Sequence, residues 1–163
     1  MIGLHRLYLY GKAQALSGTS FNQDRPGFAR FDDIQITAPL FGTIAFSDAD
    51  RVRGFREFAY GNQVLFGSAE YRIPFLPSLQ TSILGFLSLG STTISAFVDA
   101  GGVWNDGDPV AQRIGLGAEV KNAVTIGGAF KIMHAVGVAQ AAPDFGSSDH
   151  YEIYYRVRTT IPF

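Results

Sequence analysis

The sequence has no cysteine, which excludes a disulfide framework and a thiolate metal site. It has no basic cluster, and its formal net charge of −1 over 163 residues argues against a nucleic-acid partner. No run approaches the roughly 20 apolar residues that a membrane-spanning helix requires. The longest apolar run, residues 83–89, is broken by Gly85 and Ser88. A chain of this kind would enter a membrane only as strands.

The first residues, 1–6, also lack the basic region and apolar stretch of a secretion signal. Two explanations follow: a preceding part of the protein is absent from this sequence, or the protein is never exported. We favour the first. The length itself suits one domain with a compact core.

Nineteen glycines and fourteen phenylalanines, with few helix-forming runs, favour tightly turned and twisted strands. Six segments alternate apolar and polar residues with a period of two, which is typical of a sheet with two different faces. These segments are residues 4–16, 64–75, 92–104, 113–121, 130–138 and 151–163. The sequence therefore predicts an all-β, antiparallel fold of about six strands.

One face of these segments carries charged residues and glycine, and the other carries branched and aromatic residues. In segment 113–121, for example, Glu119 and Lys121 oppose Ile114 and Val120. Alternation alone does not say which face is buried, so a soluble lipocalin-like barrel remains an alternative. The gathering of charge on one face favours a hydrated interior, because a charge facing lipid costs about 2–4 kcal/mol near the midplane. His134 is an intruder on the apolar face.

The connections between the segments alternate in length. The longest covers about residues 17–62 and contains two β-like stretches, 33–37 and 42–46, which we expect to form a short hairpin within the loop. Residues 77–90 form a shorter connection, and residues 105–109 and 125–128 have the composition of tight turns.

Six strands are too few to close, since the smallest single-chain membrane barrels have about eight. An open sheet in lipid would leave two edges of unpaired backbone groups. We therefore expect further strands, from a missing N-terminal part or from other subunits.

Two short motifs carry more information than the composition. One lies late in the long loop and the other on the third predicted strand. They read Val52-Arg53-Gly54-Phe55 and Phe97-Val98-Asp99-Ala100-Gly101.

Together with the aromatic C-terminus, this ordered set resembles the C-terminal barrel of the bacterial surface-antigen superfamily, the BamA- and TamA-type outer-membrane assembly barrels. The resemblance covers nearly all residues after about 51; before them, only the layout of strand and loop agrees. It implies that residues 1–163 are the C-terminal portion of an antiparallel transmembrane β-barrel of 16 strands.

The resemblance also implies a role for the loop. In this family the long loop folds back into the lumen and places its arginine against the aspartate of the strand motif. Carried over, Arg53 is expected to pair with Asp99, and Glu70 is expected to share the charge. A guanidinium in a confined space needs carboxylates of matching geometry, and Gly54 permits a sharp turn. A lone Arg-Gly-Phe would more often be a solvated loop segment.

The final predicted strand resembles the C-terminal signal by which outer-membrane barrels are recognised during assembly. Its alternating apolar residues and terminal aromatic are Tyr155, Val157, Ile161 and Phe163. Pro162 is unusual there, because proline cannot donate a hydrogen bond to a neighbouring strand. A position at the barrel rim would tolerate that loss.

No catalytic set emerges, and we expect no enzyme activity, no metal and no cofactor. The three histidines have no partner at metal-ligand spacing. Residues 147–150 contain triad residue types, but adjacent residues in a loop cannot adopt triad geometry. Residues 105–108 would bind calcium weakly at best, and a hairpin turn needs no such role.

The sequence and its resemblance together predict a non-enzymatic outer-membrane β-barrel that acts in the insertion or translocation of proteins. The expected location is the outer membrane of a Gram-negative bacterium or of an organelle. The expected partners are the lipid bilayer, polypeptide substrates and the outer-membrane assembly machinery. The alternative is a barrel that serves as a membrane anchor or pore for an upstream enzymatic or binding domain.

Overall fold

The computed structural model describes residues 4–16, 27–28, 34–38, 42–46, 52–55, 59–77, 80–128, 130–142 and 151–160. Its regular elements are the strands β1 (Arg6–Ala15), β2 (Gly27–Phe28), β3 (Ile34–Ala38), β4 (Gly42–Phe46), β5 (Ala59–Tyr60), β6 (Gln63–Leu76), β7 (Thr81–Ile83), β8 (Leu87–Trp104), β9 (Ala111–Ile126), β10 (Phe130–Ala141) and β11 (Tyr151–Thr160). The predicted all-β class is confirmed. Within these ranges, no helix is long and apolar enough to cross a membrane.

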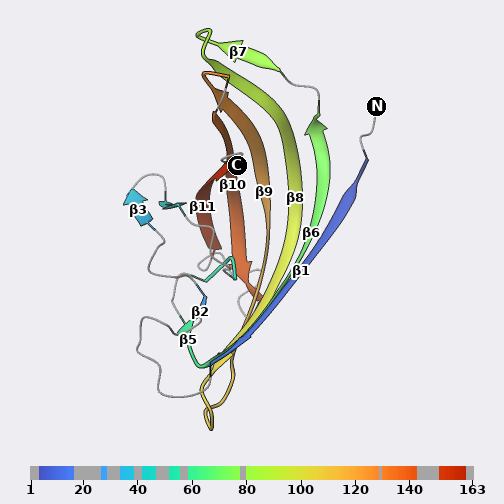
Figure 1. Ribbon diagram of the computed structural model, residues 1–163. Coiled ribbons are helices and arrows are strands. Elements are labelled where there is room, and N and C mark those ends of the chain that lie inside the picture. The colour runs from blue at the N-terminus through green and yellow to red at the C-terminus, as the bar shows by residue number, and fades with distance from the viewer. Residues whose placement is uncertain are drawn as a thin grey trace.

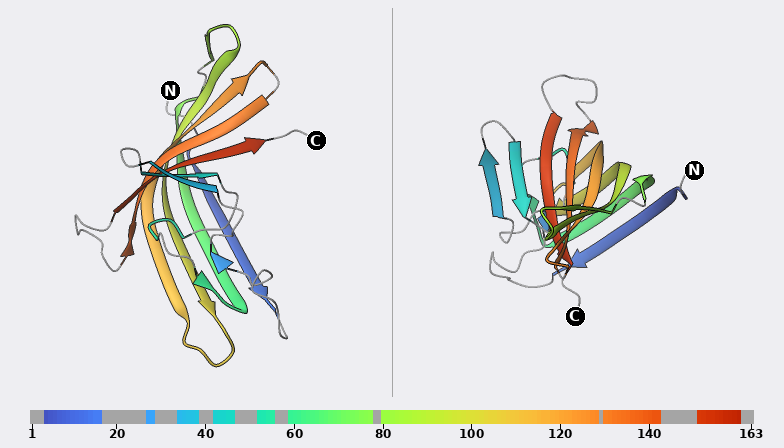
Figure 2. Two further views of the ribbon diagram at one scale, coloured as in Figure 1. Left: turned by 90° about the vertical axis from the view of Figure 1, so that its left-hand side faces the viewer. Right: turned by 90° about the horizontal axis from the view of Figure 1, so that it is seen from above.

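Nine of the described strands form one large, curved sheet with the order β1-β6-β8-β9-β10-β11-β4-β3, and β7 pairs with β8 beside it. Neighbours are antiparallel except β11 and β4. The strands bow to one side, and β2 and β5, which form a separate small sheet, lie on the concave side (Figure 1). Seen from above, β1 and β3 lie at opposite ends, so the described sheet is open (Figure 2).

Each of the six predicted segments contains one long strand, but two strand ends and one short strand were missed. The predicted third strand starts at Leu87 instead of Thr92, and the fourth continues through Ile126 instead of ending at Lys121. Strand β7 pairs with Leu87–Leu89 inside the predicted connection 77–90. The apolar run of residues 83–89 does not alternate, so a period of two could not reveal these pairs.

A bulge in β8 explains a polar position on the apolar face. The register between β8 and β9 shifts between Leu89 and Thr92. The side-chain amide of Asn122 donates to the Gly90 carbonyl at 3.0 Å and to the Thr92 hydroxyl at 2.8 Å. His134, the predicted intruder, contacts the Asn122 side-chain oxygen at 3.3 Å. These contacts satisfy backbone groups that the bulge releases from the ladder.

The two faces of the sheet differ in the way the alternation predicts: one face buries charged side chains beside apolar ones, and the other exposes apolar side chains. Charged side chains are buried on the concave face: Asp99 is 0% exposed and Glu119 is 2% exposed. Apolar side chains on the other face are open: Val98 is 50% exposed and Val136 is 52% exposed. We call these the inner and outer faces. Folded soluble proteins usually bury apolar side chains and expose charged ones.

The hairpin expected at 33–37 and 42–46 is present as β3 and β4. It lies within the expected loop, and in addition β4 pairs in parallel with Tyr154–Arg156 of β11, which the sequence did not indicate. The hairpin thus extends the sheet at the edge of the last strand. This pairing joins residues far apart in the sequence, so the local alternation of apolar and polar residues could not predict it.

Part of the predicted C-terminal signal lies in β11, which contains Tyr155 and Val157. Ile161 and Phe163 lie outside the described residues, as do residues 147–150.

Candidate functional site

The motif Val52–Phe55 forms a turn against the inner faces of the long strands. Gly54 has φ +97°, a conformation that favours glycine. A Cβ there would also lie 2.8 Å from the backbone of Gln140 in β10. Gly115 of β9 has a related role, because a Cβ on it would overlap the carbonyl oxygen of Arg53. Two glycines from distant segments, Gly54 and Gly115, therefore allow the backbone of the turn to pack closely against the sheet.

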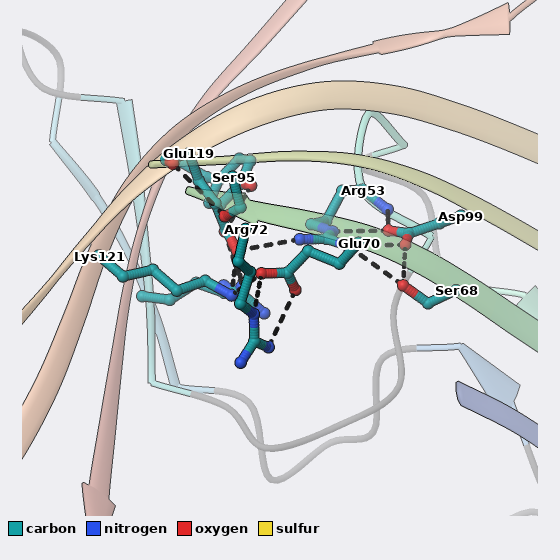
Figure 3. A network of polar contacts seen from close by, with 10 residues as sticks. Arg53, Ser68, Glu70, Arg72, Ser95, Asp99, Glu119 and Lys121 are labelled. Atoms are coloured by element: carbon teal, nitrogen blue, oxygen red, sulfur yellow. Dashed lines mark hydrogen bonds and ion pairs between the residues drawn. The ribbon is translucent and has the colours of Figure 1, made fainter. Parts of the chain in front are cut away.

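The guanidinium of Arg53 is bound by Asp99 in a two-point contact (Figure 3). Arg53 Nε donates to Asp99 Oδ2 at 2.6 Å, and Nη2 donates to Oδ1 at 2.7 Å. The backbone N–H of Arg53 donates to the same carboxylate at 3.1 Å. Ser68 of β6 donates its hydroxyl to Asp99 Oδ1 at 2.7 Å. The expected pairing of Arg53 with Asp99 is present, and Asp99 also binds the backbone of the loop residue.

The second carboxylate on Arg53 is Glu119 of β9, not Glu70. Arg53 Nη1 donates to Glu119 Oε1 at 3.1 Å. Glu70 instead accepts from Arg72 Nε at 2.6 Å and from Lys121 Nζ. Lys121 also contacts Glu119 at 2.8 Å, so Glu70 is linked to the arginine only through other charges. The expectation that Glu70 shares the charge of Arg53 directly is corrected accordingly.

Alternation places Glu119 on the charged face of its strand, so the sequence did contain a signal for it. What it did not contain was the register: Asp99 of β8 pairs with Gly115, and Ser95 pairs with Glu119. The side chain of Glu119 reaches back across that offset to the loop. A four-residue offset between strands cannot be read from one sequence.

Apolar contacts hold the turn on either side of the arginine. Val52 is buried with Val64, Phe66 and Val103, and Phe55 packs against this cluster. The Phe97 ring lies beneath the guanidinium, with Arg53 Cζ 3.3 Å from the ring centroid. Phe97 therefore supports the arginine from the strand that also supplies Asp99. Gly101, the last residue of that motif, pairs in register with Phe66 and Arg113.

The charge of Arg53 is fixed by its surroundings. Burial alone would lower the pKa of Arg53, but the hydrogen bonds and charge of Asp99, with the charge of Glu119, outweigh burial and raise it. The arginine is therefore cationic at any physiological pH. The site therefore contains a permanent positive charge that is buried and is bound by two carboxylates, those of Asp99 and Glu119.

The last strand also contributes to the site, which the motifs did not indicate. Glu152 of β11 is 2% exposed and accepts from the backbone N–H of Gly54 at 3.1 Å. Two more β11 residues, Tyr154 and Arg156, donate to Glu119, with their shortest contacts at 2.9 Å and 2.6 Å. The loop is thus bound by β6, β8, β9 and β11 together.

The arrangement is suited to holding a loop in place, and its chemistry is that of ion pairing. Among the described residues, no group of three or more histidine, cysteine or acidic side chains is placed to hold a metal ion. The two carboxylates that bind Arg53, those of Asp99 and Glu119, are each engaged by cations and hydroxyls.

No family model, no curated protein and no solved structure matches this chain.

The pairing of Arg53 with Asp99 predicts strong coupling between the two positions. Arg53→Met and Asp99→Asn should each cost about 3–5 kcal/mol, because each leaves a buried charge without its partner. The double variant should cost clearly less than the sum of the two. The measurement is the free energy of unfolding of the purified chain by urea titration, read as a double-mutant cycle. Additive losses would show that the two residues do not act as a pair.

The flat seat of the turn predicts a specific glycine effect. Gly115→Ala should displace the turn and destabilise the protein by about 1–3 kcal/mol, because the new methyl group overlaps the Arg53 carbonyl. The matched control is Gly11→Ala in β1, where a Cβ would lie 3.9 Å from its nearest neighbour, the Phe66 carbonyl oxygen. Limited proteolysis of the loop should distinguish the two variants. Equal cleavage of both would contradict the placement of the turn against β9.

Proposed function

We propose that this chain forms part of the wall of an outer-membrane β-barrel of the surface-antigen type, with the Val52–Phe55 turn docked in its lumen. In this proposal, the outer face contacts lipid and the inner face lines a hydrated space. The barrel, of 16 strands in this family, is completed by strands beyond the six long ones of this chain. The proposed activity is the insertion or translocation of polypeptides at that membrane.

The observation that carries the proposal is the difference between the two faces of the sheet: charge is buried on the inner face, and apolar side chains are exposed on the outer face. An apolar outer face with Leu65, Val98, Ile114, Val136 and Ile153 about half exposed is unfavourable in water. The same face is favourable in a bilayer, where the apolar wall of a barrel is in contact with acyl chains. The long strands are also long enough for the roughly 9–11 residues that a tilted membrane strand requires.

A second observation supports the surface-antigen type in particular. The arginine of the loop motif and the aspartate of the strand motif lie 46 residues apart in the sequence and bind each other with two hydrogen bonds. A membrane wall alone does not need an inward loop that is bound so tightly. A loop that folds back and is held by the wall is the arrangement that the resemblance implies for proteins of this type.

The membrane proposal predicts that an added charge is costly on the outer face and tolerated on the inner face. Val98→Arg on the outer face should lower the stability of the chain folded in lipid vesicles by about 2–4 kcal/mol. Gln14→Arg on the inner face of β1 is the control, and it should change the stability little because Lys12 already lies on that face. Urea titration in vesicles measures both. A purified wild-type chain that is monodisperse in plain buffer, with both variants equally stable, would overturn the proposal.

The proposed activity predicts a cellular effect of the site. Arg53→Met should reduce the amounts of other barrel proteins in the outer membrane of cells that depend on this protein, because the docked loop is part of the working conformation. The measurement is quantitative mass spectrometry of outer-membrane fractions, with the variant's own membrane level as the internal control. Unchanged levels of other barrels would remove insertion as the activity and favour the anchor or pore alternative.

A further inference from the structure

The long loop contacts the last strand at two separate places. At the inner face, the turn is bound by Glu152, which accepts from the Gly54 backbone. At the edge, β4 of the same loop pairs with Tyr154–Arg156. These contacts lie on different sides of one strand and come from parts of the loop about ten residues apart in the sequence.

The inner-face contacts of β11 come from alternate positions. Glu152, Tyr154 and Arg156 point to the same face because successive strand residues alternate. The first binds the turn, and the other two bind Glu119, the second carboxylate on Arg53. Every described inner-face side chain of β11 is therefore engaged at the loop site.

The close packing at this point depends on β10 as well. A Cβ on Gly137 would overlap the Tyr154 ring and would lie 2.9 Å from the Glu119 side chain. Gly137 pairs with Tyr154 in the β10–β11 register. The ring of Tyr154 reaches Glu119 across the bare backbone of β10. Separation of β11 from β10 would withdraw that ring and leave a buried carboxylate with fewer partners, which is costly.

The edge contact is shorter than the pairing on the opposite side of β11. Ten residue pairs join β11 to β10, and three join it to β4. An unpaired strand edge carries backbone donors and acceptors that need partners. Strand β4 supplies some of them from the loop itself. In the described sheet, the loop thus covers part of the edge of β11.

We infer that the long loop is a strap on β11: docking of the Val52–Phe55 turn and pairing of β11 with β10 stabilise each other. Because such coupling is reciprocal, weakening either one weakens the other. This adds to the proposed function a means by which the state of the lumen loop controls whether the last strand can leave the sheet. Its functional meaning rests on that proposal, while the coupling rests on the contacts above.

Hydrogen exchange tests the coupling directly. In the intact chain in detergent micelles, Glu152→Ala should speed amide exchange about tenfold or more both in the Val52–Phe55 turn and along β11. Ile153→Ala is the matched control on the same strand, because Ile153 is 48% exposed on the outer face and should leave the turn unchanged. Faster exchange in the turn with β11 unaffected would overturn the strap.

The reverse direction uses the absence of cysteine from the chain. Val138 and Ile153 are register partners in β10 and β11, and both are exposed on the outer face. A Val138→Cys, Ile153→Cys disulfide should slow exchange in the turn several-fold, and reduction should reverse this. Unaltered exchange in the turn on oxidation would show that the pairing of β11 does not reach the loop.

The edge half of the strap has its own variant. Ile44 pairs with Tyr155, and Ile44→Pro removes a backbone donor and disfavours β4. Amide exchange within Tyr154–Arg156 should become faster, and amide exchange in the Val52–Phe55 turn should become faster as well. If these amides exchange at the wild-type rate, β4 is not part of the strap.

These outcomes are separable from those of the proposed function. Coupled exchange in micelles together with a chain that does not fold into vesicles would leave the strap standing and remove the membrane wall. If the chain folds into vesicles and Val98→Arg has the expected effect, but exchange in the turn and in β11 is not coupled, the membrane wall stands and the strap is overturned.

Discussion

The rest of the structure depends on the burial of charge on one face of a sheet. Arg53, Asp99 and Glu119 lie together at a place where water is nearly excluded, and their mutual contacts compensate for lost hydration. Once this face is occupied by charges and by the loop, strand alternation sends the branched side chains to the other face. The polarity of the two faces and the position of the loop are therefore one arrangement.

The site links segments that are far apart in the sequence. Apolar residues of β6 and β8 pack against the turn. Asp99 and Glu119 bind the Arg53 side chain, and Glu152 of the last strand accepts a hydrogen bond from the Gly54 backbone. Three glycines, at 54, 115 and 137, allow the close approaches. The site depends on four strands at once, since removal of β6, β8, β9 or β11 would take away a partner of a buried polar group.

The sequence predicted the long strands and their two faces because alternation is a local signal that repeats many times. It also indicated Arg53 and Asp99, through motifs rather than through alternation. It did not predict that Glu119 would take the place expected for Glu70, because inter-strand register is set by tertiary packing. The same applies to Glu152 and to the pairing of β4 with β11, which join residues about 100 positions apart. The start of β8 was missed because a non-alternating apolar run carries no period.

The most direct test of the account is the environment of the outer face in a bilayer. Single spin labels at Val98, Ile114 and Val136 can be compared with a label at Gln14 on the inner face, by collision with oxygen, which concentrates in lipid, and with a water-soluble nickel chelate. If the outer face lies in the bilayer, the labels at Val98, Ile114 and Val136 should collide with oxygen and be protected from the nickel chelate. The label at Gln14 should collide with the nickel chelate and be protected from oxygen. Outer-face labels that collide freely with nickel in folded, vesicle-bound protein would contradict it.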